Sequence, residues 1–189
     1  MKTVDISIKN MALLQNMIGN TFEKYRCDPF VFSPSVYGIV GLYIGDKIYK
    51  ITSLVQPTER FFTKDDVAVF MIESSEDDEI VTMMDDGEMI DTPVRDTIIS
   101  IDIINDHEIV CYENEKREFV STKGIIFHLE GGNEISFEIG TWFSEMITIK
   151  RGYDLISQFS PQEEFMEEWD DCEGYSPEWS REIVTLNKR

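Results

Sequence analysis

The sequence predicts an α+β protein in which β-structure dominates: a curved antiparallel sheet or a partly open barrel, with one helix near the N-terminus and one near the C-terminus. Three observations predict this class. Apolar residues alternate with polar residues in several short runs, turn-forming residues separate these runs, and helical spacing occurs near the two ends of the chain. The 189 residues are 42% hydrophobic, which is enough for a folded single domain spanning residues 1–189.

The N-terminal region predicts a short strand followed by a helix. Val4, Ile6 and Ile8 alternate with polar residues, which is the period of a strand. Asn10 is a suitable helix N-cap, and Gly19 is a suitable helix end. Four apolar residues between them fall on one helical face: Leu13, Leu14, Met17 and Ile18.

The middle of the chain predicts three β-hairpins and two further strands. Each hairpin consists of two β-rich runs around residues that favour turns. The hairpins are 37–51, turning at Gly45-Asp46; 97–113, turning near Asn105-Asp106; and 123–139, turning at Gly131-Gly132-Asn133. The two further strands are 66–73 and 146–150.

A weak similarity between residues 35–40 and 121–126 suggests a duplicated β unit. Its two halves would be about 1–73 and 93–159, with the acidic segment 74–92 connecting them. The alternative is that any two hairpins with a leading glycine look this similar. The connecting segment contains methionine and isoleucine, so we expect a long loop that partly packs on the domain.

The C-terminal region carries a capping signal for a helix. Ser160 as N-cap, Pro161 at the first helical position and Glu163 three residues after the serine form a capping box. Phe165 and Trp169 are four residues apart and would share the buried face. A similar serine–proline start occurs at Ser176-Pro177-Glu178. It predicts a second, shorter helical turn that carries Trp179 and Ile183.

Acidic residues are concentrated in two blocks of the chain. The net charge is −20, and residues 73–91 contain nine acids and no base, while residues 163–178 contain eight acids and no base. We call these the first and the second acidic block. Such a charge distribution favours a cationic partner and disfavours nucleic acid and anionic membranes. The alternative for half of the charge is helix design, because carboxylates stabilise the first turns of a helix.

Chemical motifs are not apparent in the sequence. The two histidines, His107 and His128, and the three cysteines lack the spacing of a zinc site, and no phosphate-binding loop, nucleophile elbow or dinucleotide fingerprint occurs. We therefore predict no catalytic residue, no metal ligand and no cofactor. Three widely spaced cysteines, together with no apolar run of membrane-spanning length and no visible signal peptide, predict a cytoplasmic protein.

The leading hypothesis is a non-enzymatic acidic interaction protein that binds a basic partner, with inhibition of that partner as the consequence. A toxin, a nuclease or a nucleic-acid-binding protein would be such a partner. Phe165, Trp169 and Trp179 are candidate hydrophobic anchors beside the charge. The predicted partner-binding residues are Glu76, Asp77, Asp78, Glu79, Asp85, Asp86, Glu164, Glu167, Glu168, Asp170, Asp171 and Trp179.

Two other function classes remain open from the sequence. One is an enzyme or a ligand-binding β-barrel whose site comes from distant parts of the chain. The residues to inspect for it are His107, His128, Arg151, Tyr153 and Asp154. The other is a structural or oligomerising subunit, which would show a large apolar patch. The sequence does not predict the oligomeric state.

Overall fold

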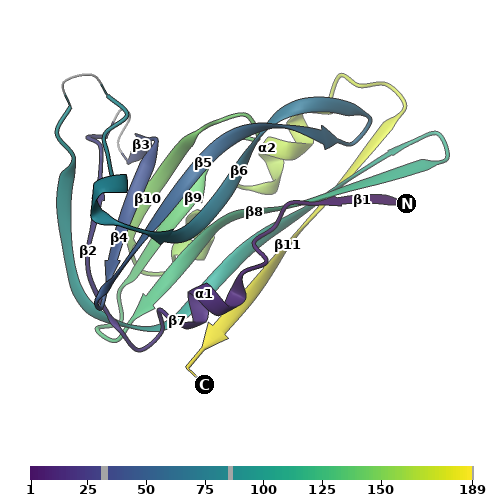
Figure 1. Ribbon diagram of the computed structural model, residues 1–189. Coiled ribbons are helices and arrows are strands. Elements are labelled where there is room, and N and C mark those ends of the chain that lie inside the picture. Colours follow the sequence, from purple (N-terminus) through teal and green to yellow (C-terminus); the bar gives the residue numbers. More distant parts are fainter. Residues whose placement is uncertain (31–33, 85–86, 189) are drawn as a thin grey trace.

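The computed structural model describes residues 1–30, 34–84 and 87–188. Its eleven strands form one open, twisted sheet (Figure 1) in the order β3-β10-β9-β8-β7-β2-β4-β5-β6, with β1 beside β8 and β11 beside β7. All pairings are antiparallel except that of β1 with β8. The predicted β-dominant antiparallel sheet is therefore confirmed. The strands are β1 (Lys2–Asp5), β2 (Thr21–Cys27), β3 (Ser35–Tyr37), β4 (Ile39–Ile44), β5 (Lys47–Arg60), β6 (Thr63–Ser75), β7 (Ile90–Tyr112), β8 (Glu115–Leu129), β9 (Glu134–Ile139), β10 (Met146–Gly152) and β11 (Tyr175–Asn187).

Two of the three predicted hairpins are confirmed. Strands β4 and β5 pair up to Ile44 and Lys47, which leaves Gly45-Asp46 as a two-residue turn. Gly45 has a φ of 60°, a left-handed conformation that glycine adopts without strain. Strands β8 and β9 pair from His128 and Glu134 away from their connecting turn, as the glycine pair predicts. The predicted strands 66–73 and 146–150 lie within β6 and β10.

The third predicted hairpin is wrong, because the chain continues through Asn105-Asp106 as one long strand. Strand β7 has 23 residues and turns only after Tyr112. Both turn-forming residues are instead buried and partnered inside the sheet: Asn105 Oδ1 accepts a hydrogen bond from Thr122 at 2.7 Å, and Asp106 accepts two from Arg181. A register shift after residue 104 absorbs the irregularity. These polar pairs replace the turn that the local sequence favours.

The predicted helical turn at Ser176-Pro177 is also wrong. Residues 175–187 form β11, which pairs along its length with β7. Pro177 is compatible with this strand because β11 has a single neighbour, and a proline without an N–H is tolerated at the edge of a sheet. Exposed and half-buried residues alternate along most of the strand, which is the β period.

Two short helices accompany the sheet, α1 (Met11–Gln15) and α2 (Gln162–Glu167). Asn10 caps α1 as predicted, its Oδ1 accepting a hydrogen bond from the backbone N–H of Leu13 at 3.2 Å. The helix ends before Gly19, yet Met17 beyond its end is fully buried. The capping box predicted for α2 is not formed. Pro161 occupies the N-cap position, and Ser160 instead donates its backbone N–H to Glu138 Oε1 at 2.6 Å.

The apolar core has one large and two smaller clusters. The large one is formed by side chains of the twisted sheet. In it the ring centroid of Phe127 lies 5.2 Å from that of Phe22 and 5.9 Å from that of Phe137. A second cluster joins the tip of the β5–β6 hairpin to β7, β8 and α2; its buried members are Phe61, Val67, Val110, Phe119 and Phe165. A third cluster lies under the 3-10 turn Leu155–Gln158. The proposed duplication into two halves stays a prediction.

Candidate partner-binding surface

Strand β6 separates the two acidic blocks. Its first residue follows the turn after β5, near α2. Its last residues, 13 positions later, lie at the start of the first acidic block. At about 3.3 Å per residue this strand spans roughly 40 Å. Figure 1 shows the 3-10 turn Asp77–Glu79 beside β2 and β4, at the end of the molecule away from α2. The two blocks therefore form separate surfaces.

Bases of the neighbouring strand β2 neutralise part of the first acidic block. Asp91 accepts hydrogen bonds from the Nε of Arg26 at 2.7 Å and from Lys24. The hydrogen bond from Arg26 lowers the pKa of Asp91 to about 2. Asp77 accepts hydrogen bonds from the Tyr43 hydroxyl at 2.6 Å and from Arg26 at 3.0 Å, and these contacts lower its pKa.

Ion pairs with Lys50 and the packing of Ile80 attach a further part of this block to the sheet. Lys50 forms ion pairs with Glu73 at 3.2 Å and with Glu79 at 3.4 Å. Ile80 is buried against Gly41, where a Cβ would lie 2.7 Å from the isoleucine side chain. Four of the seven described carboxylates in the block thus have a cationic partner, and the segment is fastened to the sheet. This confirms a loop that partly packs.

Six exposed carboxylates of the second acidic block have no cationic partner among the residues that the structure describes. They are Glu163, Glu164, Glu167, Asp170, Asp171 and Glu173. The other two acids of the block are paired: Glu168 with Arg60 at 2.8 Å, and Glu178 with Lys116 at 3.2 Å. This surface therefore carries uncompensated negative charge.

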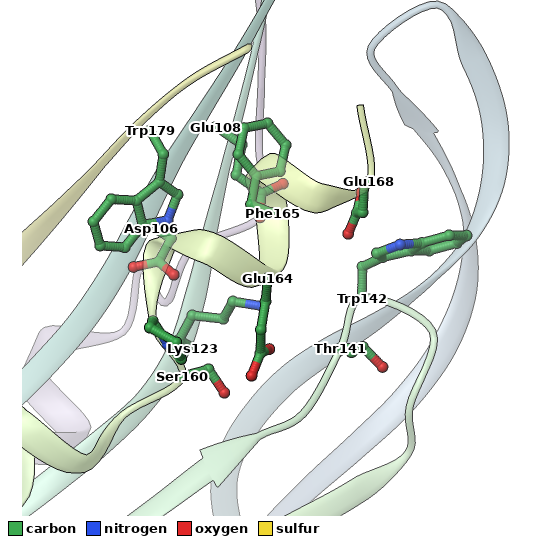
Figure 2. Close-up of a pocket in the computed structure, with 11 residues that line it drawn as sticks. Asp106, Glu108, Lys123, Thr141, Trp142, Ser160, Glu164, Phe165, Glu168 and Trp179 are labelled. Atoms are coloured by element: carbon green, nitrogen blue, oxygen red, sulfur yellow. The ribbon is translucent and has the colours of Figure 1, made fainter. Parts of the chain in front are cut away.

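A buried cluster of charges lies beneath α2, and Figure 2 shows its carboxylates Asp106, Glu108 and Glu168. The Nη2 of Arg60 contacts Glu168 at 2.8 Å and Glu108 at 3.2 Å, and Arg60 and Glu108 are 4% and 5% exposed. Burial raises the pKa of Glu108, and the positive charge of Arg60 opposes that rise. Arg181 donates two hydrogen bonds to buried Asp106, at 2.7 and 2.9 Å. These contacts tie the end of α2 to strands β5, β7 and β11.

The cavity beside this cluster is too small for an organic substrate. Its volume is about 20 Å³, which is room for a single water molecule. Figure 2 shows Lys123, Glu164 and Trp142 around it, together with Asp106 and Glu168. Three of the carboxylates around it, Asp106, Glu108 and Glu168, are engaged in ion pairs, and these pairs dock α2 against the sheet.

A larger pocket lies at the tip of the β5–β6 hairpin, and we call it the aromatic pocket. Its volume is about 200 Å³. The ring of Trp169 lies 5.5 Å from that of Phe61 and 5.3 Å from that of Tyr175, and Phe62 lies 5.8 Å from Tyr175. The lining residues are Arg60, Phe61, Phe62, Thr63, Asp65, Trp169, Cys172 and Tyr175. Sequence reasoning had singled out Trp169 alone among these rings.

The turn that builds the aromatic pocket is strained. Arg60 pairs with Thr63, so Phe61 and Phe62 form a two-residue turn. Phe61 has a φ of 55°, a left-handed conformation that is rare for a bulky residue and costs roughly 1–3 kcal/mol. The ring of Phe61 is 5% exposed and packs on Phe119 and Phe165, which offsets this cost. Phe62 is held half-buried at the surface.

The other predicted partner-binding residues fall into three groups. Glu164, Glu168 and Trp179 meet around the small cavity, where Trp179 lies 5.0 Å from the guanidinium of Arg181. The residues of the first block lie at the far end of β6: Glu76, Asp77, Asp78 and Glu79, of which Glu76 and Asp78 form no ion pair within the described part of the chain. Asp85 and Asp86 lie outside the described residues.

Three of the five residues considered for an enzyme have partners within the fold. His128 Nε2 lies 2.8 Å from Asp102 Oδ2, and this hydrogen bond raises the pKa of His128 and lowers that of Asp102. His107 lies between Glu118 and Glu182, at 3.4 and 3.7 Å. The remaining three are Arg151, which donates to the Pro93 carbonyl, exposed Tyr153, and Asp154, which precedes a 3-10 turn.

Comparison of the chain with protein-family models, with curated proteins and with solved structures finds no significant match. Neither described helix is long and apolar enough to cross a membrane. Over residues 1–30, 34–84 and 87–188, no group of three or more histidine, cysteine or carboxylate side chains is arranged to hold a metal ion. The three cysteines form no disulfide. The uncompensated carboxylates of the second acidic block are the candidate site, and the aromatic pocket lies beside them.

Proposed function

We propose that this protein is a non-enzymatic interaction protein that binds a basic partner through its second acidic block. One observation carries the proposal: six exposed carboxylates of residues 163–173 have no cationic partner within the described chain, whereas bases of β2 and β5 neutralise much of the first block. Like charges held this closely repel one another, and a cationic partner removes that repulsion.

Such a surface competes with phosphate for the basic residues of its partner. Lysine and arginine side chains that bind the phosphates of a nucleic acid can bind carboxylates in place of those phosphates. A nuclease, a toxin or a nucleic-acid-binding protein would lose access to its substrate when the acidic block occupies those side chains. The field of the block would also steer the partner toward it and accelerate association at low salt.

The test is a titration with a fluorescent deca-lysine peptide, read by anisotropy, using two charge-matched variants. One carries Glu163→Lys, Asp170→Lys and Asp171→Lys; the other carries Glu76→Lys, Asp78→Lys and Glu88→Lys. Each set reverses three exposed carboxylates that form no ion pair in the described chain, so the net charge changes equally. We expect the second-block variant to bind about tenfold more weakly, and the first-block variant to lose less than about threefold.

The same titration is repeated at several salt concentrations as a second test. Raising the salt from about 50 to about 500 mM shortens the Debye length from roughly 14 to roughly 4 Å, so wild-type affinity should fall steeply. The proposal is contradicted if the peptide is not retained at low salt. It is equally contradicted if both variants lose affinity to the same extent, because the effect would then be one of net charge alone.

One observation favours a second candidate function, that of an oligomerising subunit. Over its 13 residues β11 pairs with β7 alone, so in the described structure its outer edge has no strand beside it. An open edge can accept a strand of another chain, although Pro177 and charged residues such as Arg181 and Glu182 discourage such pairing. Sedimentation equilibrium distinguishes the two candidates, since a concentration-dependent dimer supports the subunit and a monomer does not.

A further inference from the structure

We propose that the aromatic pocket holds the side chain of an arginine from the basic partner. The inference rests on the proposed function, because it gives the acidic surface a specific anchoring point. Four rings form the walls of the pocket: Phe61, Phe62, Trp169 and Tyr175. The faces of aromatic rings attract cations, and a cage of rings is the arrangement that proteins use to recognise alkylated ammonium groups.

The charges around the pocket complement a cationic occupant. Asp65 lies in its lining, and Asp170, Asp171 and Glu173 flank the lining residues Trp169 and Cys172 in the chain. The one cation in the lining, Arg60, already has carboxylates at 2.8 and 3.2 Å. An incoming cation therefore meets a net negative field.

The protein's own packing indicates arginine as the preferred cation. Three of its arginines lie over aromatic rings in this part of the molecule: Arg60 over Trp142 at 4.9 Å, Arg181 over Trp179 at 5.0 Å and Arg117 over Phe62 at 5.3 Å. Each also forms an ion pair with a carboxylate. A planar guanidinium stacks on a ring and pairs with an acid at the same time, which the compact ammonium of lysine does less well.

Two donors of the residues that line the pocket lack an acceptor. The Nε of Arg60 and the indole Nε1 of Trp169 are buried and have no acceptor within the described structure, and Arg60 is only 4% exposed. A buried donor without an acceptor is unfavourable and calls for an explanation. The guanidinium group itself offers only donors, whereas the carbonyl groups of a peptide offer acceptors. The strained turn at Phe61 fixes this geometry in advance.

The indole N–H signals of the three tryptophans provide the test. The probe is the peptide acetyl-Gly-Gly-Arg-Gly-Gly-amide, with the lysine counterpart and guanidinium chloride as controls, and Trp169→Phe assigns the signal. We expect the Trp169 signal to shift saturably with the arginine peptide, while those of Trp142 and Trp179 move much less. The lysine peptide should bind at least about fivefold more weakly, and guanidinium chloride more weakly still.

A pocket variant separates this inference from the proposed function. Phe62→Leu keeps the apolar bulk of a half-buried residue and removes one ring face; Tyr175→Leu is a second variant of the same kind, and thermal unfolding checks that both fold. We expect each to weaken the arginine peptide about tenfold and to leave deca-lysine binding within about twofold.

Three outcomes overturn the inference and are distinguishable from failure of the proposed function. The first is that the three indole signals move together or not at all. The second is that the lysine peptide binds as well as the arginine peptide. The third is that both pocket variants bind the arginine peptide like wild type. If any of these occurs while the second-block variant still loses deca-lysine, the acidic surface binds basic partners without the pocket. If wild type retains neither peptide, the proposed function itself is wrong.

Discussion

The two acidic blocks have similar composition and different surroundings. The first follows β6 and crosses strands that carry Lys24, Arg26 and Lys50, and these bases take up its charges. The second lies on and after α2, where the nearby bases Arg60 and Arg181 are already paired with Glu108 and Asp106. Its remaining carboxylates face solvent.

The comparison teaches that charge density along a sequence does not measure the charge of a surface. A carboxylate that accepts a charge-assisted hydrogen bond contributes to the fold, and a carboxylate without such a partner contributes to the external field. Glu168 and Glu178 are the exceptions within the second block, since they pair with Arg60 and Lys116. Five predictions can break or sharpen this distinction, and they follow from the largest expected effect to the smallest.

Arg60→Met should destabilise the protein the most. The substitution leaves Glu108 buried without its cation, and breaking a buried ion pair typically costs roughly 3–5 kcal/mol. Chemical denaturation measures the free energy of unfolding. The double variant with Glu108→Gln is the control, and it should recover part of the loss. A loss below about 1 kcal/mol for the single variant would mean that the cluster beneath α2 does not stabilise the fold.

Phe165→Ala should cost roughly 3 kcal/mol, because its ring is 4% exposed and packs on Phe61. Trp169→Ala should cost less, since Trp169 is only half-buried and faces the aromatic pocket. The two free energies of unfolding, measured side by side, distinguish a core residue from a residue kept for binding. Equal losses would place Trp169 in the core and weaken its role as an anchor.

Asp91→Asn and Asp171→Asn compare one carboxylate from each block directly. Asp91 pairs with Lys24 and Arg26, so its neutralisation should cost roughly 0.5–1 kcal/mol after allowance for solvent screening. Asp171 has no ion pair in the described chain, and its neutralisation should change stability by less than about 0.5 kcal/mol. If both variants have the same stability, the ion pairs of the first block do not matter to folding.

Acid titration extends that comparison. The folded-state pKa of Asp91 is lowered to about 2, below its ordinary value of 3.8, so its contribution is present above pH 3.8 and is lost as the pH falls toward 2. The difference in stability between wild type and Asp91→Asn should therefore shrink between pH 4 and pH 2. A difference that stays constant over this range would show that the charge of Asp91 is not the cause.

His128 lies outside both acidic blocks. The substitution His128→Gln should have the smallest effect on the free energy of unfolding, and that effect should depend on pH. The hydrogen bond to Asp102 raises the folded-state pKa of His128, so the stabilisation is fully present below about pH 6.5 and is lost as the pH rises through the raised value. The stability gap to wild type, below about 0.5 kcal/mol at pH 5.5, should narrow by pH 9. A gap that widens with pH would contradict the assignment.

The sequence predicted those parts of the fold that depend on local signals. Gly45-Asp46 between two β-rich runs predicted a hairpin because glycine supplies the backbone conformation that the turn requires. Asn105-Asp106 predicted a turn that does not exist, since distant residues Thr122 and Arg181 bond these side chains inside β7. Local propensity yields to such long-range contacts.

The candidate site was less predictable than the fold. The acidic blocks are visible in the sequence, but the bases that neutralise one of them come from strands more than 20 residues away. The aromatic pocket joins the turn residues Phe61 and Phe62 to Trp169 and Tyr175 across more than 100 residues. A two-residue turn made of phenylalanines carries no recognised turn signal, so neither the hairpin at this point nor the pocket was predicted.

The association rate constant of a basic peptide tests the central claim most directly. Stopped-flow mixing of fluorescent deca-lysine with wild type and with the two charge-matched variants measures it at about 50 mM salt. We predict that reversal of Glu163, Asp170 and Asp171 slows association about tenfold, and that reversal of Glu76, Asp78 and Glu88 slows it less than about threefold, because steering depends on the uncompensated field. Equal rate constants for the two variants would contradict the account.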